Sequence, residues 1–473
     1  MQDDIQYFEE QKKIYPKATK GKFRLLKWLI MLIAFVVYYG TPWLRYDRGP
    51  NVPNQAVLID MVGSKAYLFG IEIWRQEIYY ITGILIFAAV ALFLITSLLG
   101  RVWCGYFCFQ TIWTDLFIAV EQLVQGDRNK RIKLDKGPWT FEKISKKFIT
   151  HFLWIMIGIA TGGAWVFYFN DAPTLWENLL QGDISTPVLV WVLALTASTY
   201  LMAGFAREQV CTYMCPYARF QSAMFDNKTV IIGYDKQAGE PRGHFKKQPG
   251  VTPQDKGQGY CVECTACVQV CPMGIDIRDG LQMECIACGL CIDACDDVMK
   301  KMEFPAKLIR YDIHENFEKG TPEKITAKTF LRGRFFYYSA ILGVIGGIMV
   351  YGLMNRTQTE LHVFQQRNPV YVTLSDGTIR NGYIIKLLNK THHDRHFSLK
   401  VTGLKAFNIS MGTLLTDKAL QDLEVLADSS GQFRIFITAP NQEQARSLIK
   451  IHLEDKQTGE LLTYKTVFSS MGL

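Results

Sequence analysis

Five long apolar stretches constrain the fold of this chain more than any other feature. They cover residues 25–44, 78–99, 148–169, 187–206 and 335–354 and contain almost no charged side chains. Each has the roughly 20 residues that a helix needs to cross about 30 Å of hydrocarbon. The sequence therefore predicts a membrane α-helical protein with about five transmembrane helices rather than a soluble enzyme.

The basic residues indicate how these helices are oriented. Lys and Arg are frequent in residues 12–24 and 128–147, whereas residues 170–186 contain neither. Because loops rich in Lys and Arg stay in the cytoplasm, we expect the N-terminus inside and the C-terminus outside. The 52 basic residues outnumber the 44 acidic ones mainly beside the apolar stretches, which favours membrane lipid over nucleic acid as a partner.

All twelve cysteines fall into four short motifs on the side that we expect to be cytoplasmic. The cytoplasm is reducing, so metal ligation or thiol redox chemistry is favoured over structural disulfides.

Two of the motifs are consecutive C-x2-C-x2-C-x3-C runs, between residues 261 and 295. This spacing is typical of bacterial ferredoxins with two 4Fe–4S clusters, in which the fourth cysteine of each run ligates the other cluster. The pattern predicts one cluster held by Cys261, Cys264, Cys267 and Cys295 and a second held by Cys285, Cys288, Cys291 and Cys271. A pair of zinc sites is the alternative, since C-x2-C pairs also bind zinc.

The other two motifs are C-x3-C pairs, Cys104 with Cys108 and Cys211 with Cys215, each shortly after a predicted transmembrane helix. In a continuous helix this spacing places both sulfurs on one face. Soft thiolates favour Cu(I), so these four cysteines are candidate copper ligands and catalytic residues. Simple packing of small residues at the membrane border is the alternative.

Three neighbouring residues modify this prediction. Met214 lies inside the second pair and could add a thioether ligand to copper. Arg101 and Arg207 precede the two pairs, and we expect their charge to favour ionised thiols.

These features divide the chain into five segments. We expect a cytoplasmic N-terminal segment (1–24), a membrane domain of four helices (25–229), a cytoplasmic ferredoxin-like domain (230–334), a fifth transmembrane helix (335–354) and an exported β domain (355–473). Short alternating runs after residue 354 predict an all-β sandwich. Residues 109–124 contain Asp115 and Glu121, so we expect an amphipathic helix at the membrane surface there rather than another transmembrane helix.

The segments GRVWCGYFC, CTYMCPYARFQ and CIACGLCIDACDDVM closely resemble the FixG/CcoG (RdxA-type) family of membrane iron–sulfur proteins. The resemblance covers essentially the whole chain, and it implies a bacterial inner membrane, a periplasmic immunoglobulin-like β domain and paired C-x3-C-P motifs. One motif departs from that pattern, because Phe109 follows Cys108 where the family has proline.

The resemblance also implies a function. Family members serve the assembly of cbb-type cytochrome c oxidase and look like cupric reductases, with copper chaperones or assembly factors as partners. The favoured hypothesis is therefore a membrane iron–sulfur protein that reduces Cu(II) to Cu(I) with electrons from an unidentified donor. The alternatives are a quinol-oxidising membrane ferredoxin that serves an anaerobic respiratory reductase and a non-catalytic copper scaffold. The oligomeric state stays open, with a homodimer as one option.

Overall fold

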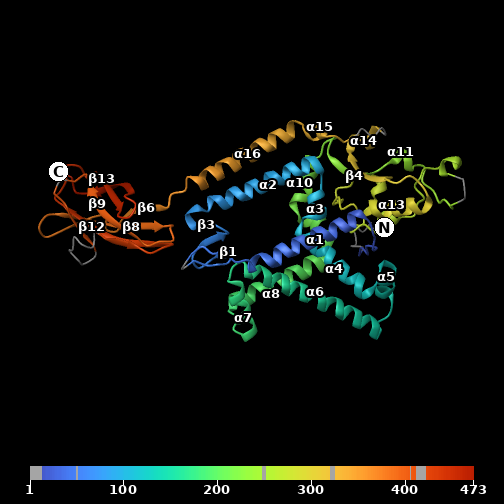
Figure 1. The fold of residues 1–473 in the computed structure, drawn as a ribbon, viewed down its shortest axis with the longest axis horizontal. Coiled ribbons are helices and arrows are strands. Elements are labelled where there is room, and N and C mark those ends of the chain that lie inside the picture. Colours follow the sequence, from blue (N-terminus) through green and yellow to red (C-terminus); the bar gives the residue numbers. More distant parts are fainter. Residues whose placement is uncertain are drawn as a thin grey trace, which may run out of the picture. The chain divides into compact units, whose positions relative to one another are not determined.

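The computed structural model describes residues 13–49, 52–247, 252–319, 325–404, 406–411 and 422–472. Figure 1 shows the ribbon, which divides into two compact units. One unit comprises Met1–Tyr46 and Gln55–Met349 and contains the cysteine motifs, and the other comprises Asp47–Asn54 and Val350–Leu473 and contains the β domain.

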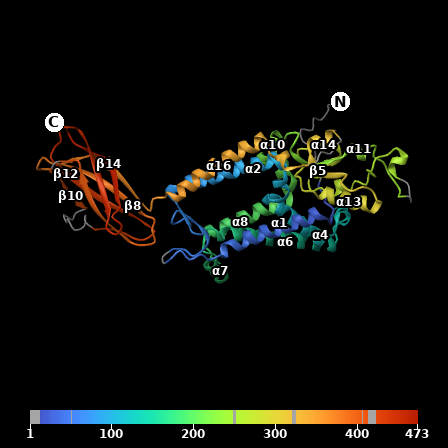
Figure 2. The ribbon, with the colours of Figure 1, turned by 45° about the horizontal axis from the view of Figure 1, so that its top comes forward.

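The five predicted transmembrane helices are confirmed. Within the described residues, five helical segments are long and apolar enough to cross a membrane: Lys22–Trp43, Arg75–Leu99, Phe141–Phe167, Thr186–Met214 and Gly333–Met354. They contain the helices α1 (Lys22–Gly40), α2 (Tyr79–Leu99), α6 (Phe141–Phe167), α8 (Thr186–Leu201) and α16 (Gly333–Met354). Helix α16 lies beside α2, as Figures 1 and 2 both show. The inside or outside location of the loops stays a prediction.

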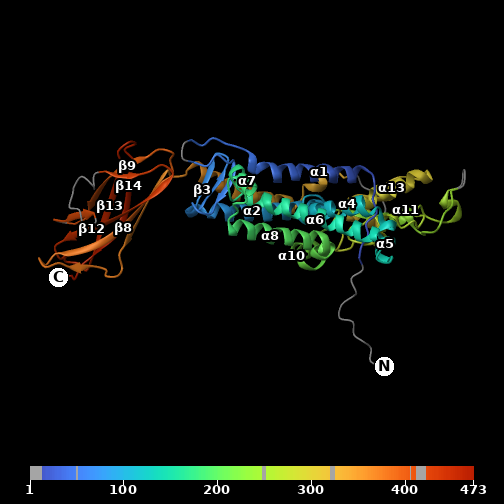
Figure 3. The ribbon, with the colours of Figure 1, turned by 90° about the horizontal axis from the view of Figure 1, so that it is seen from below.

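Helices α6 and α8 lie side by side (Figure 3), and small residues line their contact. A Cβ on Gly158 would lie 3.1 Å from Thr196 Cγ2, and one on Gly162 would lie 2.9 Å from the Val192 carbonyl oxygen. Small residues let helix backbones approach in a membrane, where no hydrophobic effect drives the helices together. This contact fixes where the C-terminal end of α8 lies, and the second C-x3-C pair follows that end.

Helix α4 (Phe109–Gln125) corrects the expected amphipathic surface helix. Its two acidic side chains face the protein interior rather than water. Asp115 pairs with Arg24 and Lys27 of α1 at 2.9 and 3.4 Å. Burial alone would raise the pKa of Asp115, but Lys27 and Arg24 hold it below its usual value. A surface helix needs water around its charges, whereas here basic side chains of neighbouring segments replace the water.

The region that contains the two ferredoxin-type runs is built on a pair of antiparallel strands. Strand β4 (Val230–Tyr234) pairs with β5 (Ile309–Ile313), and the cysteine loops lie between them in the sequence. The helices α12 (Ala266–Gln269) and α13 (Leu290–Met302) pack against each other there.

Helix α13 is joined directly to the first transmembrane helix. The Asp293 carboxylate accepts hydrogen bonds from the backbone N–H groups of Phe23 and Arg24 at 3.2 and 2.8 Å. These are among the N–H groups that the first turn of a helix leaves without intrahelical partners. A Cβ on Gly21 would lie 2.2 Å from Asp293 Cγ, so only glycine permits this close approach. The cysteine loops are thereby held against the membrane helices.

The smaller elements connect these parts. A three-stranded sheet, β1 (Val57–Asp60), β2 (Lys65–Leu68) and β3 (Ile71–Trp74), lies between α1 and α2 in the sequence and was not predicted. The remaining helices of this unit are α3 (Val102–Tyr106), α5 (Arg128–Lys136), α7 (Ala172–Gln181), α9 (Arg207–Gln209), α10 (Pro216–Met224), α11 (Lys236–Gly239), α14 (His314–Lys319) and α15 (Ala327–Phe330).

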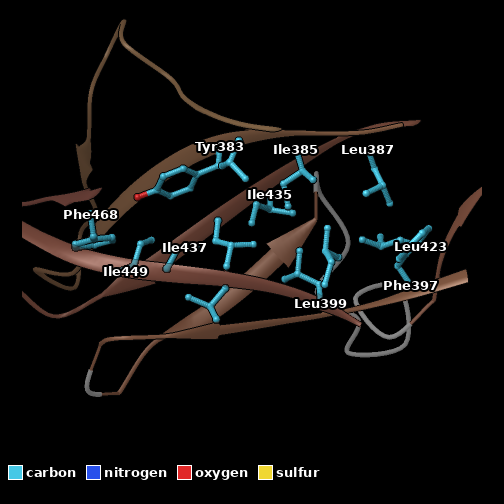
Figure 4. Packing of buried hydrophobic residues seen from close by; sticks show 14 of the residues in the cluster. Tyr383, Ile385, Leu387, Phe397, Leu399, Leu423, Ile435, Ile437, Ile449 and Phe468 are labelled. Carbon is cyan, nitrogen blue, oxygen red and sulfur yellow. The ribbon is translucent and has the colours of Figure 1, made fainter. Parts of the chain in front are cut away.

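The C-terminal unit is a sandwich of two antiparallel sheets, which confirms the predicted all-β fold. One sheet has the order β10-β12-β8-β6, with β7 paired to β8, and the other has the order β11-β9-β13-β14. Figure 4 shows side chains of both sheets meeting in one core, where Tyr383, Phe397 and Phe468 are fully buried. The strands are β6 (Thr359–Gln365), β7 (Val372–Thr373), β8 (Ile379–Asn389), β9 (Arg395–Thr402), β10 (Asn408–Met411), β11 (Leu423–Val425), β12 (Ser429–Ala439), β13 (Arg446–Asp455) and β14 (Leu461–Ser469).

Candidate functional site

The eight cysteines of the ferredoxin-type runs line two neighbouring cavities of similar size. The first cluster cavity is lined by Cys261, Cys264, Cys267 and Cys295. The second cluster cavity is lined by Cys271, Cys285, Cys288 and Cys291, with Cys267 also at its wall. Each cavity thus combines three cysteines of one run with the last cysteine of the other. Which cysteines ligate which cluster stays a prediction.

This arrangement suits an iron–sulfur cluster better than a zinc ion. Zinc needs ligands that converge on one point at about 2.3 Å, whereas a cubane holds its cysteines around a larger group. No three Cys, His, Asp or Glu side chains among the described residues converge closely enough to hold a single ion. The walls of the first cavity are otherwise mostly apolar, with Met299, Leu308 and Ile309 among them.

The loops around the cavities have an unusual backbone. Glu263, Thr265 and Ala287, which lie between successive cysteines, have φ values of 55°, 55° and 52°. This left-handed region costs energy for residues other than glycine, and such residues gather where a loop must hold a ligand. The backbone therefore turns tightly enough for successive cysteines to line one cavity.

Burial also affects the thiols themselves. It raises the pKa of Cys267 and Cys285 to about 11 and that of Cys271 to about 12. Because burial disfavours the charged form, these thiols stay protonated at neutral pH unless a cation accompanies them. Iron supplies such a charge, which fits the cavities as cluster sites.

The C-x3-C pairs differ from the predicted geometry. Cys104 lies in α3, but Cys108 is extended (φ −65°, ψ 127°) and precedes α4. Cys211 lies in a π-helical turn (Val210–Met214), and Cys215 is extended (φ −81°, ψ 111°) before α10. The expectation of one continuous helical face is therefore wrong, because the chain leaves the helix at the second cysteine of each pair.

The missing proline of the first motif does not alter this backbone. Pro216 is the first residue of α10, a position where proline is favoured, and it disfavours helical geometry at Cys215. Phe109 is likewise the first residue of α4, and Cys108 before it is extended in the same way. The two motifs therefore have matching local folds despite Phe109.

Cys104 and Cys211 pack against buried residues that also line the second cluster cavity. Both pack on one apolar cluster of buried residues that includes Cys288 and contacts Cys271. Met273 and Ile286 line the second cluster cavity and also another cavity that reaches Cys211. The membrane thiols and the cluster cysteines are therefore separated only by packed side chains.

Helix α3 holds the loop that carries Cys285 and Cys288. The Tyr106 hydroxyl donates to the Cys288 carbonyl oxygen at 3.0 Å, and Arg101 Nη1 donates to the Cys285 carbonyl oxygen at 3.5 Å. Arg101 is buried and also donates through Nη2 to the Ala218 carbonyl oxygen at 2.6 Å. One arginine thus connects both C-x3-C motifs to the second cluster cavity.

Gly105 allows this contact, and its replacement is a first test of it. A Cβ there would lie 2.6 Å from the Ile286 carbonyl oxygen and 2.9 Å from that of Ala287. Backbone atoms cannot move cheaply, so Gly105→Ala should destabilise the fold by about 1–3 kcal/mol and separate α3 from the loop. We expect faster alkylation of Cys104 and a lower unfolding temperature of the purified protein.

Gly163→Ala is the matched control, since a Cβ at Gly163 meets nothing within 4 Å. Equal alkylation rates and unfolding temperatures in both alanine variants would show that the contact between α3 and the cluster loop is not needed.

Cys104 is held by two residues that sequence reasoning did not single out. Gln221 Nε2 donates to Cys104 Sγ at 3.2 Å, and the Thr111 hydroxyl donates to the Cys104 carbonyl oxygen at 2.6 Å. Gln221 is fully buried, and its Oε1 has no hydrogen-bond partner among the described residues. The available signal was its place at the end of CTYMCPYARFQ, ten residues after Cys211.

The expected effect of the two arginines is wrong. Burial raises the pKa of Cys104 to about 11, although the hydrogen bond from Gln221 and the charge of Arg101 lower it in part. Arg207 instead donates to Glu121 Oε1 at 2.7 Å and to the Gly204 carbonyl oxygen at 2.8 Å. Its charge is therefore balanced by a carboxylate and is not available to ionise a thiol.

Met214 and the four thiols show no preformed site for one shared ion. The Met214 side chain is 57% exposed. Because no three metal-binding side chains of the described residues converge, a copper ion could be held by one pair of thiols or would require the thiols to move. A copper role for these residues stays a prediction.

Family models match three parts of the chain. Residues 206–314 match a 4Fe–4S dicluster domain, residues 81–131 match a 4Fe–4S binding domain, and residues 349–471 match a domain described as an IG-like fold at the C-terminal of FixG. The match at 349–471 confirms the predicted immunoglobulin-like domain, and the other two support 4Fe–4S clusters.

Three curated proteins match nearly the whole chain. The nitrogen fixation protein FixG of Rhizobium meliloti is 41% identical, with 98% of this chain and 94% of that protein covered. The proteins RdxB and RdxA of Cereibacter sphaeroides are each 44% identical, with 98% and 93% of this chain covered and the same shares of those proteins. With five transmembrane helices and paired cluster cavities, these likenesses indicate an oxidoreductase that transfers electrons in a membrane. The chain belongs to the FixG family of membrane iron–sulfur proteins, together with RdxA and RdxB.

Proposed function

We propose that this protein reduces Cu(II) to Cu(I) at its C-x3-C thiols and thereby serves the assembly of a cbb-type cytochrome c oxidase. The observation that supports this proposal is the contact of Cys104 and Cys211 with the apolar cluster around Cys288 and Cys271. A redox reaction at these thiols would take place next to the second cluster cavity.

The residues of the site would each have a defined part. Clusters bound in the two cavities supply single electrons. Cys104, Cys108, Cys211 and Cys215 bind the copper substrate as thiolates, which prefer Cu(I) to Cu(II), so that binding favours the reduced product. Each Cu(II) ion takes up one electron and leaves as Cu(I). Arg101 and Tyr106 keep the cluster loop in contact with the motif of Cys104.

We also propose where this takes place. The basic residues favour a cytoplasmic location for the cluster cavities and a periplasmic location for the β domain, in a bacterial inner membrane. Copper chaperones or oxidase assembly factors would then receive the Cu(I).

The test is Cu(I) formation by anaerobically purified protein, followed with a Cu(I)-specific chelator. Joint replacement of Cys104 and Cys211 by serine should reduce Cu(I) formation to background, because the thiols nearest the second cluster cavity are lost. The iron content should stay at about eight atoms per chain. Tyr213→Phe, at an exposed position within the second motif, is the control and should retain full activity.

Two results would contradict the proposal. Undiminished Cu(I) formation in the variant that has serine at all four C-x3-C positions would show that copper is reduced elsewhere or not by this protein. A loss of iron in the Cys104 and Cys211 variant would show that these thiols hold a cluster rather than copper.

A further inference from the structure

A polar cavity lies between α4, α6 and the residues that follow α8. Its volume is about 330 Å³, and it is lined by His151 and Trp154 of α6, Phe205 of the π-helical segment Met202–Ala206, Glu121 of α4, and Arg207. Binding sites for small molecules typically have about 300–1,000 Å³ and combine an apolar wall with a few polar groups. Ionisable residues within transmembrane segments are costly and are usually functional.

One wall of this cavity is aromatic. The His151 ring is nearly parallel to that of Phe205, with centroids 6.0 Å apart, and perpendicular to that of Trp154 at 5.2 Å. His151 Nδ1 is hydrogen-bonded to the Tyr200 hydroxyl at 3.0 Å. Within the described residues Nε2 makes no hydrogen bond, so one ring nitrogen remains able to bind a ligand. Phe205 lies in a segment that is long and apolar enough to cross a membrane and is 53% exposed, so we expect it to face lipid.

The opposite wall is charged. The Glu121 carboxylate is paired with Arg207 at 2.7 Å and with Arg131 at 2.9 Å, all three side chains being buried. Lys147 also lines the cavity, at the end of α6 where basic residues are frequent. An aromatic wall beside the lipid and a charged wall at the helix end suit a ligand that arrives through the bilayer and bears a polar ring.

The cavity is linked to the thiols through shared residues. Arg207 and Glu208 line both this cavity and the smaller one that reaches Cys211, Met273 and Ile286. Arg207 lies between two π-helical segments, Met202–Ala206 and Val210–Met214, and has a φ of 34°. π-helical turns and positive φ values are costly and gather at functional sites.

We propose that this cavity binds the head group of a quinol, a lipid-soluble donor of two electrons. Oxidation of one quinol breaks two O–H bonds and releases two protons and two electrons. His151 Nε2 would accept one proton and solvent the other, and the two cysteine-lined cavities would hold 4Fe–4S clusters, each of which can take up one electron. This proposal identifies the electron donor of the protein. It is independent of the proposal that Cu(II) is the electron acceptor.

The experiment measures quinone binding to the iron-loaded protein in phospholipid nanodiscs, without copper. A short-chain azidoquinone should label peptides of residues 141–167 or 202–209 after illumination. His151→Asn and Phe205→Trp should each weaken binding about tenfold, the first through a lost hydrogen bond and the second by filling the cavity. Phe152→Trp is the matched control, because Phe152 neighbours His151 but is 51% exposed and does not line the cavity.

Labelling elsewhere in the chain, or equal affinity in all three variants when their iron content is normal, would overturn the proposal. Displacement of the label by anionic phospholipid but not by unlabelled quinone would also overturn it, because the cavity would then be a lipid site. Since binding is measured without copper, neither result bears on the cupric reductase assay.

Discussion

Replacement of Cys271 by serine should halve the iron content of anaerobically purified protein, from about eight to about four atoms per chain. Cys271 belongs to the first run in sequence, but it lines the second cluster cavity with Cys285, Cys288 and Cys291. A buried serine hydroxyl cannot replace the thiolate, so the whole second cluster should be lost. Iron and acid-labile sulfide analysis measures the change.

The identity of the lost cluster gives the sharper result. Cys271→Ser and Cys288→Ser should remove the same electron paramagnetic resonance signal of the reduced protein, whereas Cys295→Ser and Cys264→Ser should remove the other one. If Cys271→Ser and Cys264→Ser instead remove the same signal, each run holds its own cluster. The cysteines that line one cavity would then not be the ligands of one cluster. Tyr213→Phe serves as control and should retain both signals.

The features that the sequence revealed are those encoded locally. Hydropathy identifies each transmembrane helix from about 20 consecutive residues, and four cysteines within eleven residues restrict how a loop can fold around a cluster. The β domain was recognised in the same way, from alternating runs such as the one that becomes β8. Strand β6, of seven residues, and the short strands β10 and β11, of four and three residues, were not predicted.

The features that the sequence concealed depend on contacts between distant segments. Asp115 was assigned to a helix at the membrane surface because a charged residue needs water or a partner. Its partners on α1 precede it by 88 and 91 residues, so the sequence pattern did not reveal them. The thiol of Cys104 looked easy to ionise because Arg101 is near in sequence, whereas its burial depends on the packing of α3 against the cluster loop. Gly105 could not be singled out from the sequence, because it matters only through its close approach to the Ile286 carbonyl oxygen.

Glu121 should be the most sensitive charged residue for stability. It is 3% exposed and pairs with Arg131 and Arg207, which are 1% and 8% exposed. Burial alone would raise its pKa, but Arg207 and Arg131 hold the pKa below its usual value, so the residue is ionised. Glu121→Gln leaves two buried guanidinium groups without a counter-charge. Removing one partner of a buried ion pair costs about 3–5 kcal/mol, and the unfolding temperature in detergent should fall accordingly.

Glu142→Gln is the matched control for this prediction. Glu142 also pairs with a basic residue, Lys146 at 2.6 Å, but on the protein surface, where water solvates both partners. Its replacement should leave the unfolding temperature unchanged. Because the destabilisation arises from unpaired charge, the double variant Glu121→Gln with Arg207→Gln should lose less stability than the sum of the two single variants. Strict additivity would instead mean that Glu121 and Arg207 stabilise the fold independently, and that the buried pair is not what holds α4 to α9.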